Sequence, residues 1–141
     1  MTGALVLLGT LVLASVAGLV LRARNGRVRT TGTVGALPAD VRDVVHPEVP
    51  VTLVQLSTDF CAPCRQARIV LSDLASATAG VHHAEVDLTH RPDLARALSV
   101  LRTPTTLAVD AGGRELLRVG GVPNRKALLD ALRPHLESSL T

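Results

Sequence analysis

The only two cysteines of this 141-residue chain, Cys61 and Cys64, lie between an apolar run and a helical pattern. The run over residues 51–56 has the length and the branched side chains of a buried strand. Apolar residues at helical spacing begin directly after the second cysteine. Two cysteines separated by two residues, behind a strand and at the start of a helix, indicate a redox-active dithiol.

The position of Cys61 at the start of that helix favours its thiolate. Unpaired backbone N–H groups and the positive end of the helix dipole stabilise an anion there. We therefore predict Cys61 as the nucleophile. Cys64, one turn further along, can attack the mixed disulfide that Cys61 forms with a substrate and release the reduced product. Arg65 and Arg68 follow on the same helix, and we interpret them as solvated surface charges.

A cysteine pair of this kind can also belong to a metal site or to a purely structural disulfide. Zinc needs about four ligands. The chain has no second cysteine pair, and the adjacent His82 and His83 would point to opposite faces of a strand. A disulfide that closes so short a loop constrains the unfolded chain little. We therefore expect redox chemistry with no metal and no bound cofactor.

Residues 4–21 contain only uncharged, small or apolar side chains. As a helix this stretch would be roughly 27 Å long, close to the thickness of a bilayer's hydrocarbon core. A cleavable signal peptide is the alternative, but no Lys or Arg precedes the stretch. We predict a retained transmembrane anchor over residues 1–21, a basic juxtamembrane linker over 22–37 and a folded domain over 38–141. Within the linker, residues 27–31 are the alternative position for a first edge strand.

Four arginines follow the apolar stretch: Arg22, Arg24, Arg27 and Arg29. The positive-inside rule then places the rest of the chain in the cytoplasm, with an extracytoplasmic domain as the alternative. The formal net charge is +3, and without these four arginines it is −1. The basic charge therefore belongs to the anchor flank, which favours contact with anionic lipid head groups and argues against nucleic-acid binding.

The remaining sequence predicts helices over residues 39–45, 66–78 and 124–136, with another that starts near Pro92. It predicts strands over residues 81–88, 103–109 and 115–119, the last two joined by a hairpin turn. The expected inward positions of the helix over 66–78 are Ile69, Val70, Leu71, Leu74 and Ala77. Those of the last helix, with a kink or break at Pro134, are Ala127, Leu128, Ala131, Leu132 and Leu136. A strand-helix-strand crossover followed by a hairpin implies a mixed sheet with helices on both faces.

Four segments of the chain resemble the thioredoxin family. One of them, Val86-Asp87 followed by Pro92, resembles its third strand and next helix. Residues 60–65, FCAPCR, are similar to that family's Trp-Cys-Gly-Pro-Cys-Lys/Arg motif. Residues 103–105, Thr-Pro-Thr, resemble its cis-proline loop, and residues 119–121, Val-Gly-Gly, resemble the loop at which partners dock. The resemblance covers roughly residues 49–136 and includes the same order of elements.

The resemblance implies an α/β fold: a thioredoxin-like mixed central sheet flanked by helices, here preceded by one N-terminal transmembrane helix. It implies a monomeric thiol-disulfide oxidoreductase that reduces protein disulfides and is recycled by an external reductant. It also implies a cis peptide bond before Pro104. The residues expected to bind the substrate are Phe60, Thr103, Pro104 and Gly120.

Three departures from the family pattern qualify this expectation. Gln55 replaces a buried Asp and cannot accept the proton of the second cysteine, so Cys64 is expected to be activated more weakly. Phe60 replaces Trp, and Ala62 replaces Gly inside the motif. These departures leave open a non-catalytic, membrane-anchored binding module.

Three histidines could be considered as proton shuttles: His82, His83 and His90. We expect them instead to be exposed strand and turn residues, because nothing in the sequence brings them to the cysteines.

Overall fold

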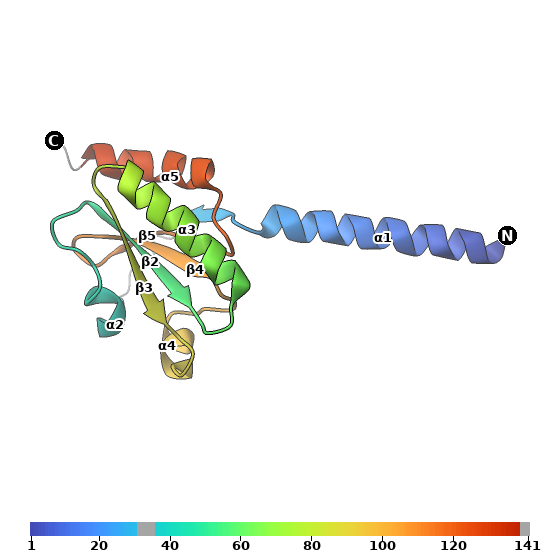
Figure 1. Cartoon of the computed structure of the whole chain (residues 1–141), viewed down its shortest axis with the longest axis horizontal. Helices are drawn as coiled ribbons and strands as arrows, with labels where there is room; N and C mark the ends of the chain where they lie inside the picture. The colour runs from blue at the N-terminus through green and yellow to red at the C-terminus, as the bar shows by residue number, and fades with distance from the viewer. Residues whose placement is uncertain (31–35, 139–141) are drawn as a thin grey trace.

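A computed structural model of the chain describes residues 1–30 and 36–138 and contains a five-stranded sheet (Figure 1). The strand order is β1-β5-β4-β2-β3. The strands are β1 (Val28–Thr30), β2 (Val51–Ser57), β3 (Val81–Asp87), β4 (Thr105–Asp110) and β5 (Glu115–Gly120). Strands β2 and β3 are parallel, whereas β4 is antiparallel to both β2 and β5. This is the predicted mixed sheet with its crossover and its hairpin.

Strand β1 lies in the segment predicted as a linker and is the alternative edge strand. It pairs antiparallel with β5, so that Val28 lies opposite Val119. The folded unit therefore includes residues before position 38. Residues 31–35 of the predicted linker and residues 139–141 of the predicted domain lie outside the described residues.

Helices cover both faces of the sheet. On one face α3 (Ala62–Ala77) and α5 (Arg125–Glu137) enclose an apolar cluster with β2, β4 and β5. On the other face α2 (Ala39–Arg42) and α4 (Pro92–Ala97) enclose a second apolar cluster. The sheet is thus the middle layer of three, and β2 is buried along its whole length.

Helix α3 begins at Ala62, which confirms that Cys61 lies at its start, because the sulfur of Cys61 caps the helix and Pro63 fits its first turn. Its predicted apolar stripe is partly wrong, since Ile69 is 63% exposed and Ala77 is also exposed. The buried positions follow a spacing of three and four residues: Cys64, Ala67, Leu71 and Leu74. Ile69 falls off that stripe and faces outward.

Helix α5 continues through Pro134 to Glu137, so the predicted break is absent. Proline removes only one backbone donor so near a helix end, and Leu136 still packs against the core. Ala127 is exposed, contrary to the prediction, because the first turn of α5 presents it to solvent. Leu128 and Leu132 are fully buried, as predicted.

Helix α1 (Thr2–Arg24) has no buried residue and extends away from the sheet (Figure 1). Its length and apolar composition are sufficient to cross a membrane. Gly26 links it to β1 with a φ of 73°, a left-handed conformation that glycine adopts at low cost. A Cβ atom at this position would lie 2.6 Å from the carbonyl oxygen of Val122, so any side chain would collide with the backbone.

Candidate active site

Cys61 and Cys64 form a disulfide at the N-terminus of α3, directly behind β2. Their sulfur atoms are 2.08 Å apart. Cys64 is 2% exposed, whereas Cys61 is half-buried. The backbone N–H of Cys64 points at the sulfur of Cys61 at 3.2 Å, as a helix-capping donor would. The outer cysteine is therefore the one that solvent and a substrate can reach.

The loop that contains Pro104 lies beside this disulfide. The Thr103–Pro104 peptide bond is cis, as the resemblance implies. The hydroxyl oxygen of Thr103 is 3.8 Å from the sulfur of Cys61 and 3.3 Å from the hydroxyl oxygen of Thr58. Pro104 is buried, and its carbonyl accepts a hydrogen bond from the N–H of Gly121 at 2.7 Å. Three predicted site residues, Cys61, Thr103 and Pro104, thus lie together.

Phe60 and Gly120 differ in how they are held. The side chain of Phe60 is fully exposed, and its φ of 57° is uncommon for a bulky residue. The carbonyl of Gly120 accepts hydrogen bonds from the N–H of Gly26 and from the guanidinium of Arg102. A Cβ atom on Gly120 would lie 2.8 Å from that guanidinium, so a side chain there would displace it. For both residues, contact with a substrate stays a prediction.

A buried hydrogen-bond chain connects β3 to the second cysteine. Gln55 is fully buried on β2, and its amide nitrogen donates to the carbonyl of Cys64 at 2.8 Å. Its amide oxygen is 3.1 Å from Nε2 of His83. Because that oxygen can only accept, Nε2 of His83 carries the proton of this hydrogen bond. His83 is therefore connected to Cys64 through one side chain.

This connection corrects the prediction that His83 is an exposed strand residue. His83 is half-buried, and burial lowers its pKa below the ordinary value. His82 points to the opposite face, where its ring centroid is 5.0 Å from that of His46, and it too is half-buried. His90 is exposed, as expected. One signal could have revealed the contact: polar residues alternate along β2 and β3 at their neighbouring ends.

A second polar group, Glu85, lies next to this chain. Arg68 of α3 donates two hydrogen bonds of 2.7 Å to Glu85, and the hydroxyl of Ser57 donates another. The hydrogen bonds from Arg68, with that from Ser57, hold the pKa of Glu85 below its usual range. Arg68 is an exposed surface charge, as interpreted, with 52% of its side chain exposed, and it also pairs with Glu85. Glu85 is ionised at neutral pH and its charge is compensated.

Within residues 1–30 and 36–138, no group of three or more His, Cys, Asp or Glu residues is arranged to hold a metal ion.

Comparison with known proteins identifies the fold and the family. The Thioredoxin family model matches residues 37–134. A mutant thioredoxin from Halobacterium salinarum superposes with a TM-score of 0.56 at 27% identity, covering 64% of this chain and 78% of that one. The oxidised mitochondrial thioredoxin 3 of Saccharomyces cerevisiae has a TM-score of 0.52 at 22% identity, covering 62% and 81%. At 22% identity, the similarity to the yeast protein shows the fold alone.

Two curated relatives are more similar in sequence. Thioredoxin C-2 of Corynebacterium nephridii is 34% identical over 85 residues, which are 60% of this chain and 78% of that protein. A bifunctional thioredoxin reductase/thioredoxin of Mycobacterium leprae is 32% identical over 88 residues. That match spans 62% of this chain but only 19% of the relative. With a matching family model around a bonded cysteine pair, this chain belongs to the thioredoxin family and is a thiol-disulfide oxidoreductase.

Proposed function

We propose that the chain reduces disulfides of protein substrates at Cys61 and Cys64, close to a membrane surface. The observation that carries the proposal is the unequal exposure of the two sulfurs at one helix N-terminus. The half-buried Cys61 can meet a substrate, whereas Cys64 is buried directly behind it. Such an arrangement separates the attacking thiol from the resolving thiol.

The reaction proceeds in two exchanges. The thiolate of Cys61 attacks one sulfur of the substrate disulfide, a mixed disulfide forms, and the other substrate sulfur leaves as a thiolate that takes up a proton. Cys64 then loses its proton and attacks the sulfur of Cys61, which releases the second substrate thiol. Two electrons pass to the substrate and the pair becomes the Cys61–Cys64 disulfide. An external dithiol must return those electrons before the next cycle.

The loop beside the disulfide supports the docking of an extended substrate segment. Within the described residues, neither the N–H nor the C=O of Thr103 makes a hydrogen bond. These groups are available to pair with a substrate backbone next to Cys61. Phe60 adds an exposed apolar ring beside the cysteine. Gly120 directly precedes Gly121, which bonds to Pro104, and its missing side chain makes room for the guanidinium of Arg102.

The membrane setting rests on α1. This helix buries no residue against the domain, and its apolar surface is larger than a soluble domain usually exposes. We propose that residues 1–21 anchor the chain, with the redox domain on the cytoplasmic side. Carbonate extraction of membranes tests the anchor. If residues 1–21 span the membrane, the protein stays in the membrane pellet. Protease treatment of intact cells tests the side: the domain is protected if cytoplasmic and cut if extracytoplasmic.

The direction of exchange is tested by the reduction potential of the cysteine pair. The full chain in neutral detergent is equilibrated with dithiothreitol or glutathione buffers, and the reduced fraction is read from the mass shift after thiol alkylation. A midpoint near about −270 mV supports a disulfide reductase. A midpoint between roughly −120 and −180 mV identifies an oxidant or isomerase and also reopens the cytoplasmic placement.

The second candidate is a membrane-anchored binding module whose cysteines do not turn over. Gln55 favours it, because its amide contacts the backbone of Cys64 but cannot take up a proton. A Cys64→Ala variant of a reductase traps mixed disulfides with cellular proteins. If no mixed disulfide forms and partner binding survives the loss of both thiols, the module is the correct function.

A further inference from the structure

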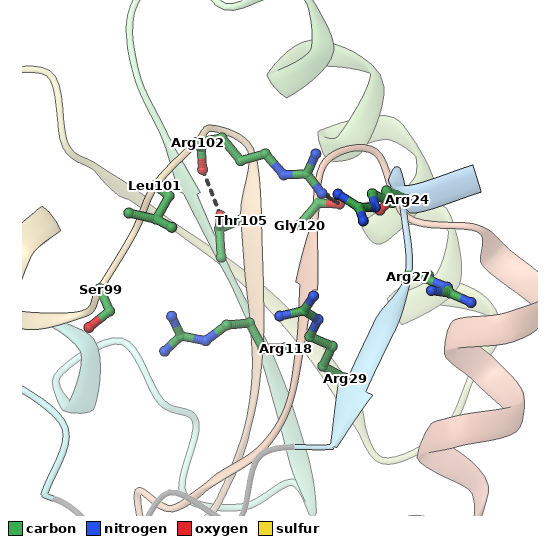
Figure 2. A pocket seen from close by; sticks show the side chains of 9 residues that line it. All are labelled: Arg24, Arg27, Arg29, Ser99, Leu101, Arg102, Thr105, Arg118 and Gly120. Atoms are coloured by element: carbon green, nitrogen blue, oxygen red, sulfur yellow. Dashed lines mark hydrogen bonds between the residues drawn. The ribbon is translucent and has the colours of Figure 1, made fainter. Parts of the chain in front are cut away.

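A cavity of about 540 Å³ lies where the end of α1 meets the edge of the sheet (Figure 2). Figure 2 shows Arg24 and Arg102 beside Gly120, Arg29 of β1 next to Arg118, and Arg27 just before β1. Nine of the described residues line the cavity, and none of these nine is acidic. Five of the nine are arginines: Arg24, Arg27, Arg29, Arg102 and Arg118.

The sheet register places two of these arginines opposite each other on one face. Arg29 pairs directly with Arg118 across β1 and β5, so both side chains point to the same side. Arg27 directly precedes β1 and lines the same cavity. The intervening Val28 packs on the opposite face, against the core under α3 and α5. Like charges directly opposite each other in a sheet are destabilising, and an anion between them would remove that cost.

Little of this positive charge is neutralised within the protein. Arg118 makes two hydrogen bonds to Glu115 at 2.8 and 2.9 Å. Within the described part of the chain, Arg102 donates to two carbonyl oxygens, those of Gly120 and Arg24, and to no carboxylate. Among residues 1–30 and 36–138, no carboxylate forms an ion pair with the three other arginines of the cavity.

We propose that this cavity binds the phosphate of an anionic phospholipid head group. Guanidinium groups present paired N–H donors that match phosphate oxygens, and several can surround one phosphate. Arg24 ends α1, so the cavity lies at head-group level if that helix crosses the bilayer. The lipid source thus rests on the proposed membrane anchor, whereas the phosphate chemistry rests on the cavity alone.

Two neighbouring features fit a lipid better than a free anion. Leu101 lines the cavity with 97% of its surface exposed, and it can contact the apolar part of a lipid. Arg102 also holds the Gly120 carbonyl, and the adjacent Gly121 donates to Pro104. A bound head group would therefore lie beside the substrate loop and orient the redox site relative to the membrane.

The test is a titration of the full, isotope-labelled chain in dodecyl maltoside, a detergent without charge or phosphate. Phosphatidylglycerol, inorganic phosphate and a hexaglutamate peptide are added separately. Binding is read from the amide resonances of Thr105, Arg118 and Gly120. We expect saturable shifts with phosphatidylglycerol at an apparent Kd at least tenfold lower than with either other probe.

Two double variants remove equal charge. Arg27→Gln with Arg29→Gln should weaken phosphatidylglycerol binding roughly 25-fold, about fivefold for each arginine. Arg22→Gln with Arg125→Gln should leave it within twofold, because neither residue lines the cavity. Arg102 lies outside β1, so Arg102→Gln tests the site even if the double variant disturbs that strand. It should weaken phosphatidylglycerol binding about fivefold.

Three results would overturn the proposal. Equal affinity for inorganic phosphate would make this a free-anion site, and tighter binding of hexaglutamate would make it a site for acidic peptides. Equal weakening in both double variants would mean attraction without a defined site. The titration requires neither thiol chemistry nor a bilayer, so its failure is distinct from failure of the proposed function.

Discussion

At both ends of β2, side chains on one face of the sheet contact the same helix, α3. The contacts at the two ends of the strand differ in chemistry. At its start, Val51 and Leu53 belong to an apolar cluster with Leu71 and Leu74 of α3. At its end, Gln55 bonds to the carbonyl of Cys64 and to His83. One helix therefore packs by apolar contact at its C-terminal half and by hydrogen bonds at its N-terminal half.

This difference separates stability from chemistry along one element. Apolar burial is non-directional and contributes most of the stability of a fold. Hydrogen bonds in a buried site are directional and fix the position of the groups that make them. We infer that the apolar end anchors α3 while the polar end positions its first turn, where the cysteines lie.

The largest expected effect is at the polar end, in Cys64→Ser. This variant should lose turnover in a disulfide-reduction assay down to the uncatalysed background, because the mixed disulfide on Cys61 has no resolving thiol. It should accumulate that mixed disulfide, visible by non-reducing gel and mass spectrometry. Turnover near the wild-type level would show that an external thiol resolves the intermediate.

At the apolar end, Leu71→Ala should lower the free energy of unfolding by about 2–5 kcal/mol, because a fully buried side chain leaves a cavity. Urea unfolding of the full chain in detergent, followed by circular dichroism, measures this. Turnover per folded molecule should stay within about twofold. A large loss of turnover in the folded fraction would break the separation of the two ends. Ile69→Ala, on the exposed side of α3, is the matched control and should change little.

At the polar end of β2, Gln55 can be compared with Thr106, its neighbour on β4. Gln55→Ala should lower the free energy of unfolding by about 1–3 kcal/mol, because it leaves buried hydrogen-bonding groups without their partner. Thr106 lies opposite Gln55 on β4, and its buried hydroxyl has no hydrogen-bond partner within the described residues. Thr106→Val should therefore be neutral or stabilising by up to about 1 kcal/mol. Urea unfolding measures the free energy of unfolding of both variants. An equal loss of stability in Gln55→Ala and Thr106→Val would contradict the role given to the hydrogen bonds of Gln55.

The smallest effect is a pH dependence that comes from His83. Burial lowers its pKa in the folded chain below the ordinary 6.5, although Glu85 opposes this shift and His82 and Arg68 add to it. Between the folded pKa and 6.5 the unfolded chain binds more protons, so stability falls as the pH falls through that window. His83→Gln should remove this slope while retaining a donor to Gln55. The free energies of unfolding of His83→Gln and of the wild type, measured at several pH values below 7, should therefore diverge. Parallel pH dependences of the two proteins would contradict the lowered pKa of His83.

Much of the fold could be predicted because its signals are local. The strand, the cysteine pair and the start of α3 follow one another within a few residues, and the hairpin turn between β4 and β5 lies where predicted. Strand β1 has three residues, too few to show a periodicity, so it could be named only as an alternative to a linker. In α3 the apolar residues are contiguous from Ile69 to Leu71, and packing alone decides which of them faces the core.

The rest of the site depends on register between distant segments. His83 reaches Gln55 because β3 pairs in parallel with β2, a relation that neither segment contains by itself. The same is true of Arg29 and Arg118, which come together across β1 and β5. Alternating polar residues could have suggested that β2 and β3 share a polar face, but the sequence alone does not tell which of these residues are neighbours across the sheet.

The central claim, that Cys61 is the attacking thiol and Cys64 the resolving one, is tested most directly by competitive alkylation. The reduced full chain is treated with a limiting amount of iodoacetamide at several pH values, and tandem mass spectrometry locates the label. We predict that Cys61 carries most of the label and reacts with an apparent pKa below the ordinary value of about 8.5. Preferential labelling of Cys64, or equal labelling with an ordinary pKa, would contradict the account.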